Sequence, residues 1–173
     1  MNRQQLYEDG IEEAKKAYAA FENMLFIALF VLGFMGMFKL TLIGLPLVSV
    51  SYALFIVIML GFVLRKHLCT QCYYYDKWCH CGWGKLSSAM FKKDAGNQEL
   101  GGKLAQLTWG IIMGVPIIGM AAVIIMDINS LTHELLFLVP FVILVAINGV
   151  LHVKDCRMCK MRFICPGSGA KKK

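Results

Sequence analysis

The sequence predicts an all-α integral membrane protein with four transmembrane helices, arranged as two duplicated hairpins with cysteine-rich cytoplasmic loops. Three observations lead to this fold class: four long apolar stretches, positive charge on one side of them, and cysteines confined to two places. Of the 173 residues, 58% are hydrophobic and 17% are charged, which is more apolar and less charged than a soluble globular domain.

Each apolar stretch is long enough, or nearly so, to cross a hydrocarbon core of about 30 Å as a helix. The stretches comprise residues 24–38, 40–64, 104–126 and 135–153. A buried helix of a soluble protein is the alternative for any one of them. Four in so small a chain leave almost nothing to bury them, so we expect an integral membrane protein.

Lys and Arg residues set the expected orientation. Of the 18 in the chain, only Lys39 falls in a connection on the opposite side of the spans from the rest. The positive-inside rule then places both termini and the central loop in the cytoplasm. We therefore expect a multi-pass protein of the cell inner (cytoplasmic) membrane. This bias accounts for the net charge of +7, so the lipid membrane is the expected partner and nucleic acid is not.

The segment before the first stretch is acidic and lacks the positive leader of a secretory signal. Its apolar residues recur at helical spacing, which indicates a helix lying on the membrane surface. We predict an N-terminal amphipathic helix over 1–22 and the first hairpin with its cysteines over 23–82. An interfacial helix and linker should follow over 83–103, and the second hairpin, its cysteines and a basic tail over 104–173.

An internal repeat supports the two hairpins. Val63-Leu64, four residues and Cys69-x-x-Cys72 are matched by Val150-Leu151, four residues and Cys156-x-x-Cys159. The later Cys79-His80-Cys81-Gly82 is answered by Cys165-Pro166-Gly167. Two hairpins of one orientation that end in one motif predict a duplication about a pseudo-twofold axis along the membrane normal.

The chemistry of the chain lies in two cysteine clusters. The first cysteine cluster is Cys69, Cys72, Cys79 and Cys81, and the second is Cys156, Cys159 and Cys165. The cytoplasm keeps thiols reduced, and CxxC pairs there are more often metal ligands or redox thiols than disulfides. Two such pairs can supply four sulfurs to zinc or to an iron–sulfur cluster. We expect all seven cysteines to be metal ligands, and we assign no catalytic residue.

Two resemblances bear on this interpretation. Cys156-x2-Cys159-x5-Cys165-Pro166 resembles the loops that hold auxiliary iron–sulfur clusters in the SPASM segments of radical-SAM enzymes, and its Cys-Pro ending is similar to bacterial ferredoxin motifs. The final SPASM cysteine is missing, and the resemblance implies cluster ligation only. The whole chain resembles uncharacterised prokaryotic four-helix membrane proteins with paired cytoplasmic CxxC loops, through its Cys-x-x-Cys, Tyr-Tyr and Gly-Trp-Gly-Lys signature. That family brings no function with it.

The hypothesis is a membrane-anchored iron–sulfur protein with one or two [4Fe–4S] clusters, which transfers electrons between a cytoplasmic donor and a membrane acceptor. It would work with other subunits or a redox partner and would not be an enzyme on its own. The alternative is a zinc-stapled structural subunit or scaffold. A thiol oxidoreductase, a transporter and a haem held by His67 and His152 are weaker. Asn148, polar and deep in the last stretch, would bond to another helix or contact a ligand such as a quinone oxygen.

Overall fold

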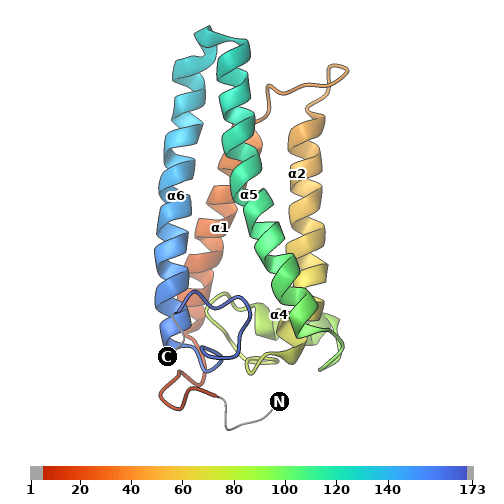
Figure 1. Ribbon diagram of the computed structural model, residues 1–173, viewed down its shortest axis with the longest axis vertical. Coiled ribbons are helices and arrows are strands. Elements are labelled where there is room, and N and C mark those ends of the chain that lie inside the picture. The colour runs from red at the N-terminus through yellow and green to blue at the C-terminus, as the bar shows by residue number, and fades with distance from the viewer. Residues whose placement is uncertain (1–5, 171–173) are drawn as a thin grey trace.

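Four long helices run side by side in the structure, a computed structural model that describes residues 6–170 (Figure 1). Each of the four is long and apolar enough to cross a membrane, as expected of a multi-pass membrane protein. Within the described residues the regular structure is helical apart from two isolated bridges, which confirms the predicted all-α fold. The helices are α1 (Lys16–Gly36), α2 (Leu47–Ile58) with its continuation, α5 (Gln98–Met126) and α6 (Leu131–Met158).

The outer surface of the helices is apolar. Ile118 and Ile125 of α5 and Leu136 and Val150 of α6 are all largely exposed. A soluble protein rarely presents such a continuous apolar surface to water, whereas lipid tails are a fitting solvent for it. The exposed faces therefore agree with a membrane environment.

The second span leads directly into the first cysteine cluster. After α2 the chain makes a π-helical turn over Met59–Val63, continues as α3 (Leu64–His67) and tightens into a 3-10 turn over Cys69–Gln71. The Arg65 side chain folds back and donates to the Leu60 carbonyl at 2.9 Å. The cysteines thus begin where the helix ends, as the sequence predicted.

The predicted N-terminal helix over 1–22 is wrong for residues 6–15, and residues 16–22 are helical only as the start of α1. Residues 6–15 form turns and bends, α1 begins only at Lys16, and residues 1–5 lie outside the described part. The backbone of this segment bonds to distant segments instead of to itself. Ile11 N–H donates to Met158 O at 2.9 Å, and Ala14 N–H donates to Trp78 O at 2.7 Å.

A short helix, α4 (Trp83–Met90), stands at the start of the predicted 83–103 segment, and the linker after it is shorter than expected. α5 begins at Gln98, so residues 98–103 extend the third span. Asn97 caps this start by accepting from Leu100 N–H at 3.0 Å. Gly101 and Gly102, which suggested a linker, instead allow close packing: an added Cβ would lie 2.9 Å from Leu68 and 2.4 Å from Pro166 respectively.

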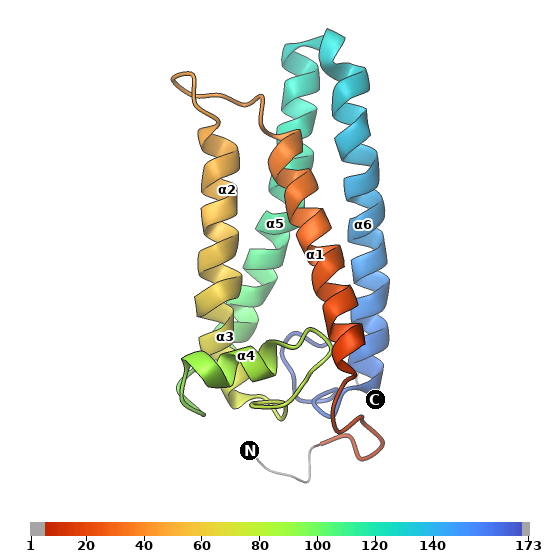
Figure 2. The ribbon, with the colours of Figure 1, turned by 180° about the vertical axis from the view of Figure 1, so that it is seen from behind.

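α1 is the central helix of the bundle, since it packs against α2, α5 and α6 (Figure 2). Gly33 marks the closest approach. A Cβ at Gly33 would lie 2.9 Å from the Tyr52 hydroxyl, 3.0 Å from Pro116 and 3.2 Å from Phe141, one residue from each neighbouring helix. The side chains of Leu29, Ile112 and Phe141 are fully buried around this contact. Close packing of this kind, rather than the hydrophobic effect, holds helices together in lipid.

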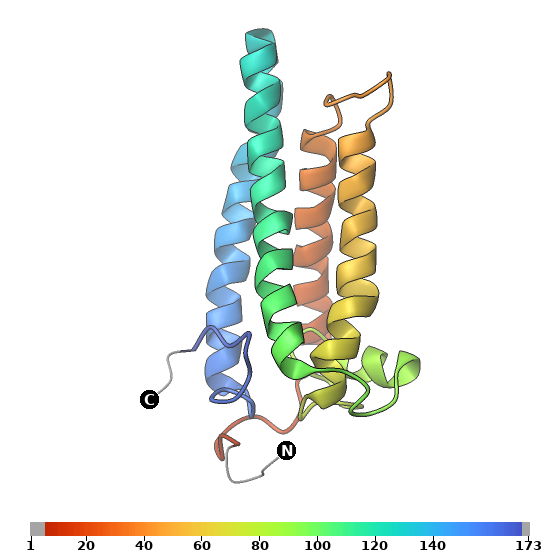
Figure 3. The same cartoon turned by 45° about the vertical axis from the view of Figure 1, so that its right-hand side comes forward.

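The two ends of the bundle differ in chemistry. At one end Lys39 Nζ lies 3.4 Å from the buried Glu134 carboxylate and donates to Ser130 Oγ at 3.1 Å, which ties the α1–α2 connection to the start of α6. At the other end lie α4 and both cysteine clusters, and we call it the cysteine end (Figure 3). The described chain both starts and finishes there.

A substitution tests the packing at Gly33. Gly33→Ala should lower the free energy of unfolding by about 1–3 kcal/mol, because rigid groups from three helices surround the new methyl group. Gly114→Ala is the matched control: nothing lies within 4 Å of its Cβ position, so stability should hold or rise slightly. Thermal unfolding in detergent, followed by circular dichroism, measures both. Equal midpoints for the two variants would contradict the packing described.

Candidate metal centre at the cysteine end

The two CxxC motifs adopt the same backbone turn. Cys72 N–H donates to Cys69 O, and Cys159 N–H donates to Cys156 O, each at 3.3 Å. Further on, Tyr75 N–H donates to Cys72 O at 3.1 Å and Arg162 N–H to Cys159 O at 3.0 Å. In each case a helix that spans the bundle has just ended. The matched spacing in the sequence therefore gives matched geometry.

Thiols from both clusters meet at the cysteine end. Burial raises the pKa of Cys72 well above its usual value, and the neighbouring Cys69, Cys165 and Cys159 raise it further. Cys165 also raises the pKa of Cys159. Charge on Cys156 also raises the pKa of Cys159 and of Cys165, so thiols of both clusters influence one another at this end. We call Cys69, Cys72, Cys159 and Cys165, two from each cluster, the four-thiol group.

Burial has the largest effect on the pKa values of the thiols that lie outside the spans. All seven cysteines are free and half-buried. Desolvation raises the pKa of Cys159 to about 11, that of Cys81 well above the usual value, and that of Cys165 above it too. Reactive thiols have a lowered pKa, so these three are poor nucleophiles. They are suited to being deprotonated by a bound metal, which releases their protons.

Backbone N–H groups point at the sulfurs in a repeated way. Met161 N–H donates to Cys159 Sγ at 3.4 Å. Equivalent bonds from Tyr74 and Gly167 lower the pKa of Cys72 and of Cys165 against the larger effect of burial. In all three the donor is two residues after the cysteine. Hydrogen bonds to sulfur are one means by which proteins tune bound iron–sulfur groups.

The remaining cysteines line a cavity beside the four-thiol group. Cys79, Cys81 and Cys156 contribute to a space of about 170 Å³ between α1, α6 and the first cysteine cluster. Cys156 Sγ lies 3.7 Å from His152 Nε2 and accepts from Gly169 N–H at 3.3 Å. The other lining residues are Glu22, Phe26, His80, Asn148, His152, Asp155 and Cys159.

Buried polar groups from α1 and α6 join at this cavity. Tyr18 Oη donates to Asp155 Oδ1 at 2.9 Å, and His80 Nε2 lies 3.7 Å from the same oxygen. Cys81 Sγ donates to Glu22 Oε2 at 3.4 Å. Burial lowers the pKa of His80 more than Asp155 raises it, which favours a neutral imidazole. Glu22, Asp155 and His80 are each buried although all three are ionisable.

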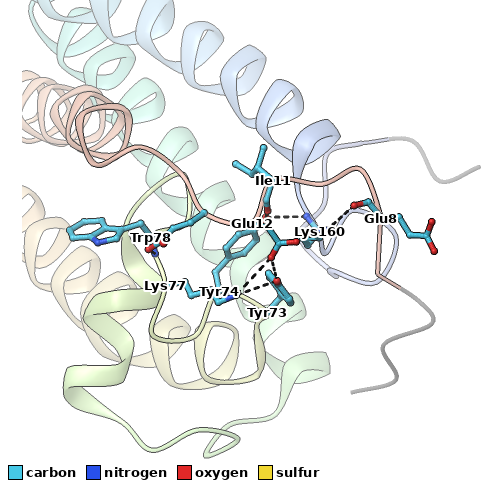
Figure 4. A network of polar contacts seen from close by, with 9 residues as sticks. Glu8, Ile11, Glu12, Tyr73, Tyr74, Lys77, Trp78 and Lys160 are labelled. Carbon is cyan, nitrogen blue, oxygen red and sulfur yellow. Dashed lines mark hydrogen bonds and ion pairs between the residues drawn. The ribbon is translucent and has the colours of Figure 1, made fainter.

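A segment at the N-terminus covers the cysteine end, and we call residues 7–14 the N-terminal strap (Figure 4). It contacts both clusters. On the side of the second cluster, Ile11 pairs with Cys159 in an isolated bridge and Tyr7 N–H donates to Lys160 O at 2.9 Å. On the side of the first cluster, Glu13 Oε1 accepts from Trp78 N–H at 2.9 Å.

Glu12 is the ionic contact of the N-terminal strap. Its carboxylate lies 2.8 Å from Lys160 Nζ and 4.0 Å from Lys77 Nζ, and it accepts from the Tyr73 hydroxyl. The hydrogen bond from Lys160 and then that from Tyr73 hold the Glu12 pKa below its usual value. The carboxylate is therefore charged at neutral pH, and one side chain links both cysteine clusters. Tyr74 adds a second link, since its hydroxyl donates to Ile11 O at 2.6 Å and accepts from Lys160 N–H at 3.1 Å.

Sequence reasoning missed Glu22 and Tyr18 as residues of the site, whereas it considered Asp155 and His152 as possible fourth ligands of the second cysteine cluster. Glu22 gave a signal, because it lies two residues before the first apolar stretch, close to a region where a carboxylate is costly. Asn148 was expected to bond between helices, but its amide donates to Leu144 O in its own helix at 2.8 Å. His67, considered for haem, accepts from Asn97 N–H at 3.1 Å, away from the cavity.

The thiols of both clusters lie at the same end of the bundle, but their sulfurs do not surround a single point. Within residues 6–170, no set of three or more His, Cys, Asp or Glu side chains is positioned as it stands to hold a metal ion. No protein-family model, curated protein or solved structure matches this chain. Its function is therefore inferred from the site itself.

The N-terminal strap should shield Cys159. Gly10 lies against the backbone of Lys160, where an added Cβ would be 2.7 Å from the Lys160 nitrogen. Gly10→Val should displace the strap and speed alkylation of Cys159 by N-ethylmaleimide several-fold in chelator-treated protein. Gly167→Ala, which has nothing within 4 Å of its Cβ position, should leave the rate unchanged. Peptide mapping by mass spectrometry measures both, and an unchanged rate in Gly10→Val would mean that the strap shields nothing.

Proposed function

We propose that this chain is a membrane-anchored iron–sulfur protein that transfers electrons between a cytoplasmic donor and a membrane acceptor. The ligands would be the four-thiol group, so that one [4Fe–4S] cluster is shared between the two cysteine clusters. The observation that carries the proposal is the position of both CxxC turns, with their matched backbone hydrogen bonds, at the same end of a bundle of apolar helices.

The surroundings of the four-thiol group support a redox centre. Binding requires the four sulfurs to draw together, and the two CxxC turns already direct N–H groups at their sulfurs. The cluster would lie beneath the N-terminal strap and beside the cavity between α1 and α6. Burial and hydrogen bonding of this kind set the potential of an iron–sulfur group.

The orientation belongs to the same proposal. Among residues 6–170, nearly all Lys and Arg belong to the segments at the cysteine end, and Lys39 stands at the opposite end. By the positive-inside rule, the cysteine end with both termini faces the cytoplasm of a cell with this protein in its inner membrane. We further propose that the two hairpins arose by duplication, a view supported by the matched hydrogen bonds at the two CxxC turns.

A zinc staple is the second candidate. Four thiolates suit structural zinc, and here they would fasten the ends of α3 and α6, as the N-terminal strap already does through Glu12. A staple gives no reason for the cavity beside it, with buried Glu22, His80 and Asp155. For that reason we favour the redox centre, with other subunits or a soluble redox protein as partners.

Metal analysis separates the two candidates. Protein purified without oxygen in detergent should contain about four irons and matching acid-labile sulfide per chain, with a broad absorption band near 400 nm that bleaches with dithionite. One zinc per chain without colour or sulfide would overturn electron transfer and establish the staple. About eight irons would mean one cluster for each cysteine cluster and not a shared one.

Single cysteine variants test the shared ligand set. Cys72→Ala and Cys165→Ala, one from each cluster, should each abolish bound iron and sulfide, because a shared centre needs both sides. Cys81→Ala is the matched control: it is a buried thiol of the first cluster that lies outside the four-thiol group, and it should retain the metal. If Cys165→Ala kept half of the iron, two separate centres would replace the shared one. Iron and sulfide per chain, with circular dichroism to check folding, give the answer.

A further inference from the structure

The cavity beside the four-thiol group holds one unsatisfied buried donor or acceptor. His80 is 8% exposed, and its Nε2 has no hydrogen-bond partner among the described residues. Its nearest polar neighbour is Asp155 Oδ1 at 3.7 Å, beyond hydrogen-bond range. A buried polar atom without a partner costs about 1–3 kcal/mol. The ring lines the cavity, so a ligand there could bond to Nε2.

The size of the cavity limits the ligand. Its volume of about 170 Å³ is close to the roughly 150 Å³ of an engineered cavity known to bind benzene. One six-membered ring therefore fits, whereas a nucleotide or a haem does not. Phe26 of α1 contributes an aromatic ring to the lining.

The charges around the cavity limit it further. Glu22 and Asp155 are buried carboxyl groups, so any negative charge that they carry would repel an anionic ligand. A neutral ring with hydrogen-bonding oxygens fits both limits.

The remaining polar contact comes from within the membrane-spanning part. Asn148 of α6 is 7% exposed, and its amide donates one bond to Leu144 O. An amide nitrogen carries two donors, so the second is available to the cavity. His80 approaches from the first cysteine cluster and Asn148 from the span. A ring with two opposed oxygens would be held at both edges.

From these observations we propose that the cavity binds the headgroup of a membrane quinone, with His80 and Asn148 bonding to its oxygens and Phe26 packing on its ring. The direction of electron flow rests on the proposed function: reduction of the quinone to the quinol would take two electrons from the iron–sulfur cluster, one at a time, and two protons from water, one for each oxygen. Binding itself does not depend on the metal.

Tryptophan fluorescence reports binding directly. The Trp83 and Trp109 rings lie 6.1 and 5.4 Å from the Phe26 ring, centroid to centroid. Titration of the purified full chain in detergent with decylubiquinone should quench this fluorescence saturably. His80→Ala and Asn148→Leu should each weaken binding at least tenfold, and His80→Gln, which keeps a donor, should recover part of it. His67→Ala, a histidine outside the cavity, should bind as the unchanged chain does.

The outcomes of this experiment are distinct from those of metal analysis. Saturable quenching that depends on His80 supports the quinone site even in a preparation without iron, in which case the proposed electron transfer fails and the binding site stands. Linear quenching that is equal in all variants overturns the quinone site, whatever the iron content. Saturable quenching that survives both His80→Ala and Asn148→Leu, with both variants folded by circular dichroism, overturns it as well, because the quinone then binds elsewhere.

Discussion

The contact between α1 and α6 is the interaction on which the cysteine end depends. Tyr18 of α1 donates to Asp155, and Glu22 of α1 accepts from Cys81. The N-terminal strap, which precedes α1, pairs with Cys159 through Ile11. The second cysteine cluster reaches the first only because α6 lies along α1 for most of its length. Gly33 makes that packing possible, since a side chain there would strike Phe141 of α6. Apolar helix packing at the middle of the bundle thus sets the positions of thiols at its end.

The boundary between lipid and water explains why the polar groups gather where they do. In the hydrocarbon region no water is present to form hydrogen bonds with a polar backbone or side-chain group. Polar side chains are therefore found mainly between helices, where the protein supplies their partners. Glu22, Asn148 and Asp155 lie between α1 and α6 and are all buried. Two buried carboxyl groups serve no packing purpose that apolar residues would not serve better. Their presence beside the thiols points to chemistry in that cavity.

The sequence predicted the architecture well, because spans and cysteine motifs are local signals. Apolar runs gave four helices, and the matched CxxC spacing gave two matched turns. The N-terminal strap could not be predicted in this way. Its residues repeat at helical spacing, but their backbone partners are Met158, Lys160 and Trp78, which are distant in sequence. The start of α5 at Gln98 could not be predicted for a similar reason. In the sequence Gly101 and Gly102 are typical of a linker, and only the structure shows that Leu68 and Pro166 pack against them.

The division of the seven cysteines was also beyond the sequence, and it bears most on function. By spacing alone, Cys156 and Cys159 belong together as one pair. In the structure Cys156 lies beside His152, whereas Cys159 accepts from Met161 N–H, and both line the cavity. A helix end separates the two, because Cys156 lies within α6 and Cys159 follows it. Four of the seven thiols border a polar cavity, namely Cys79, Cys81, Cys156 and Cys159. That position fits a centre that exchanges something with the space beside it.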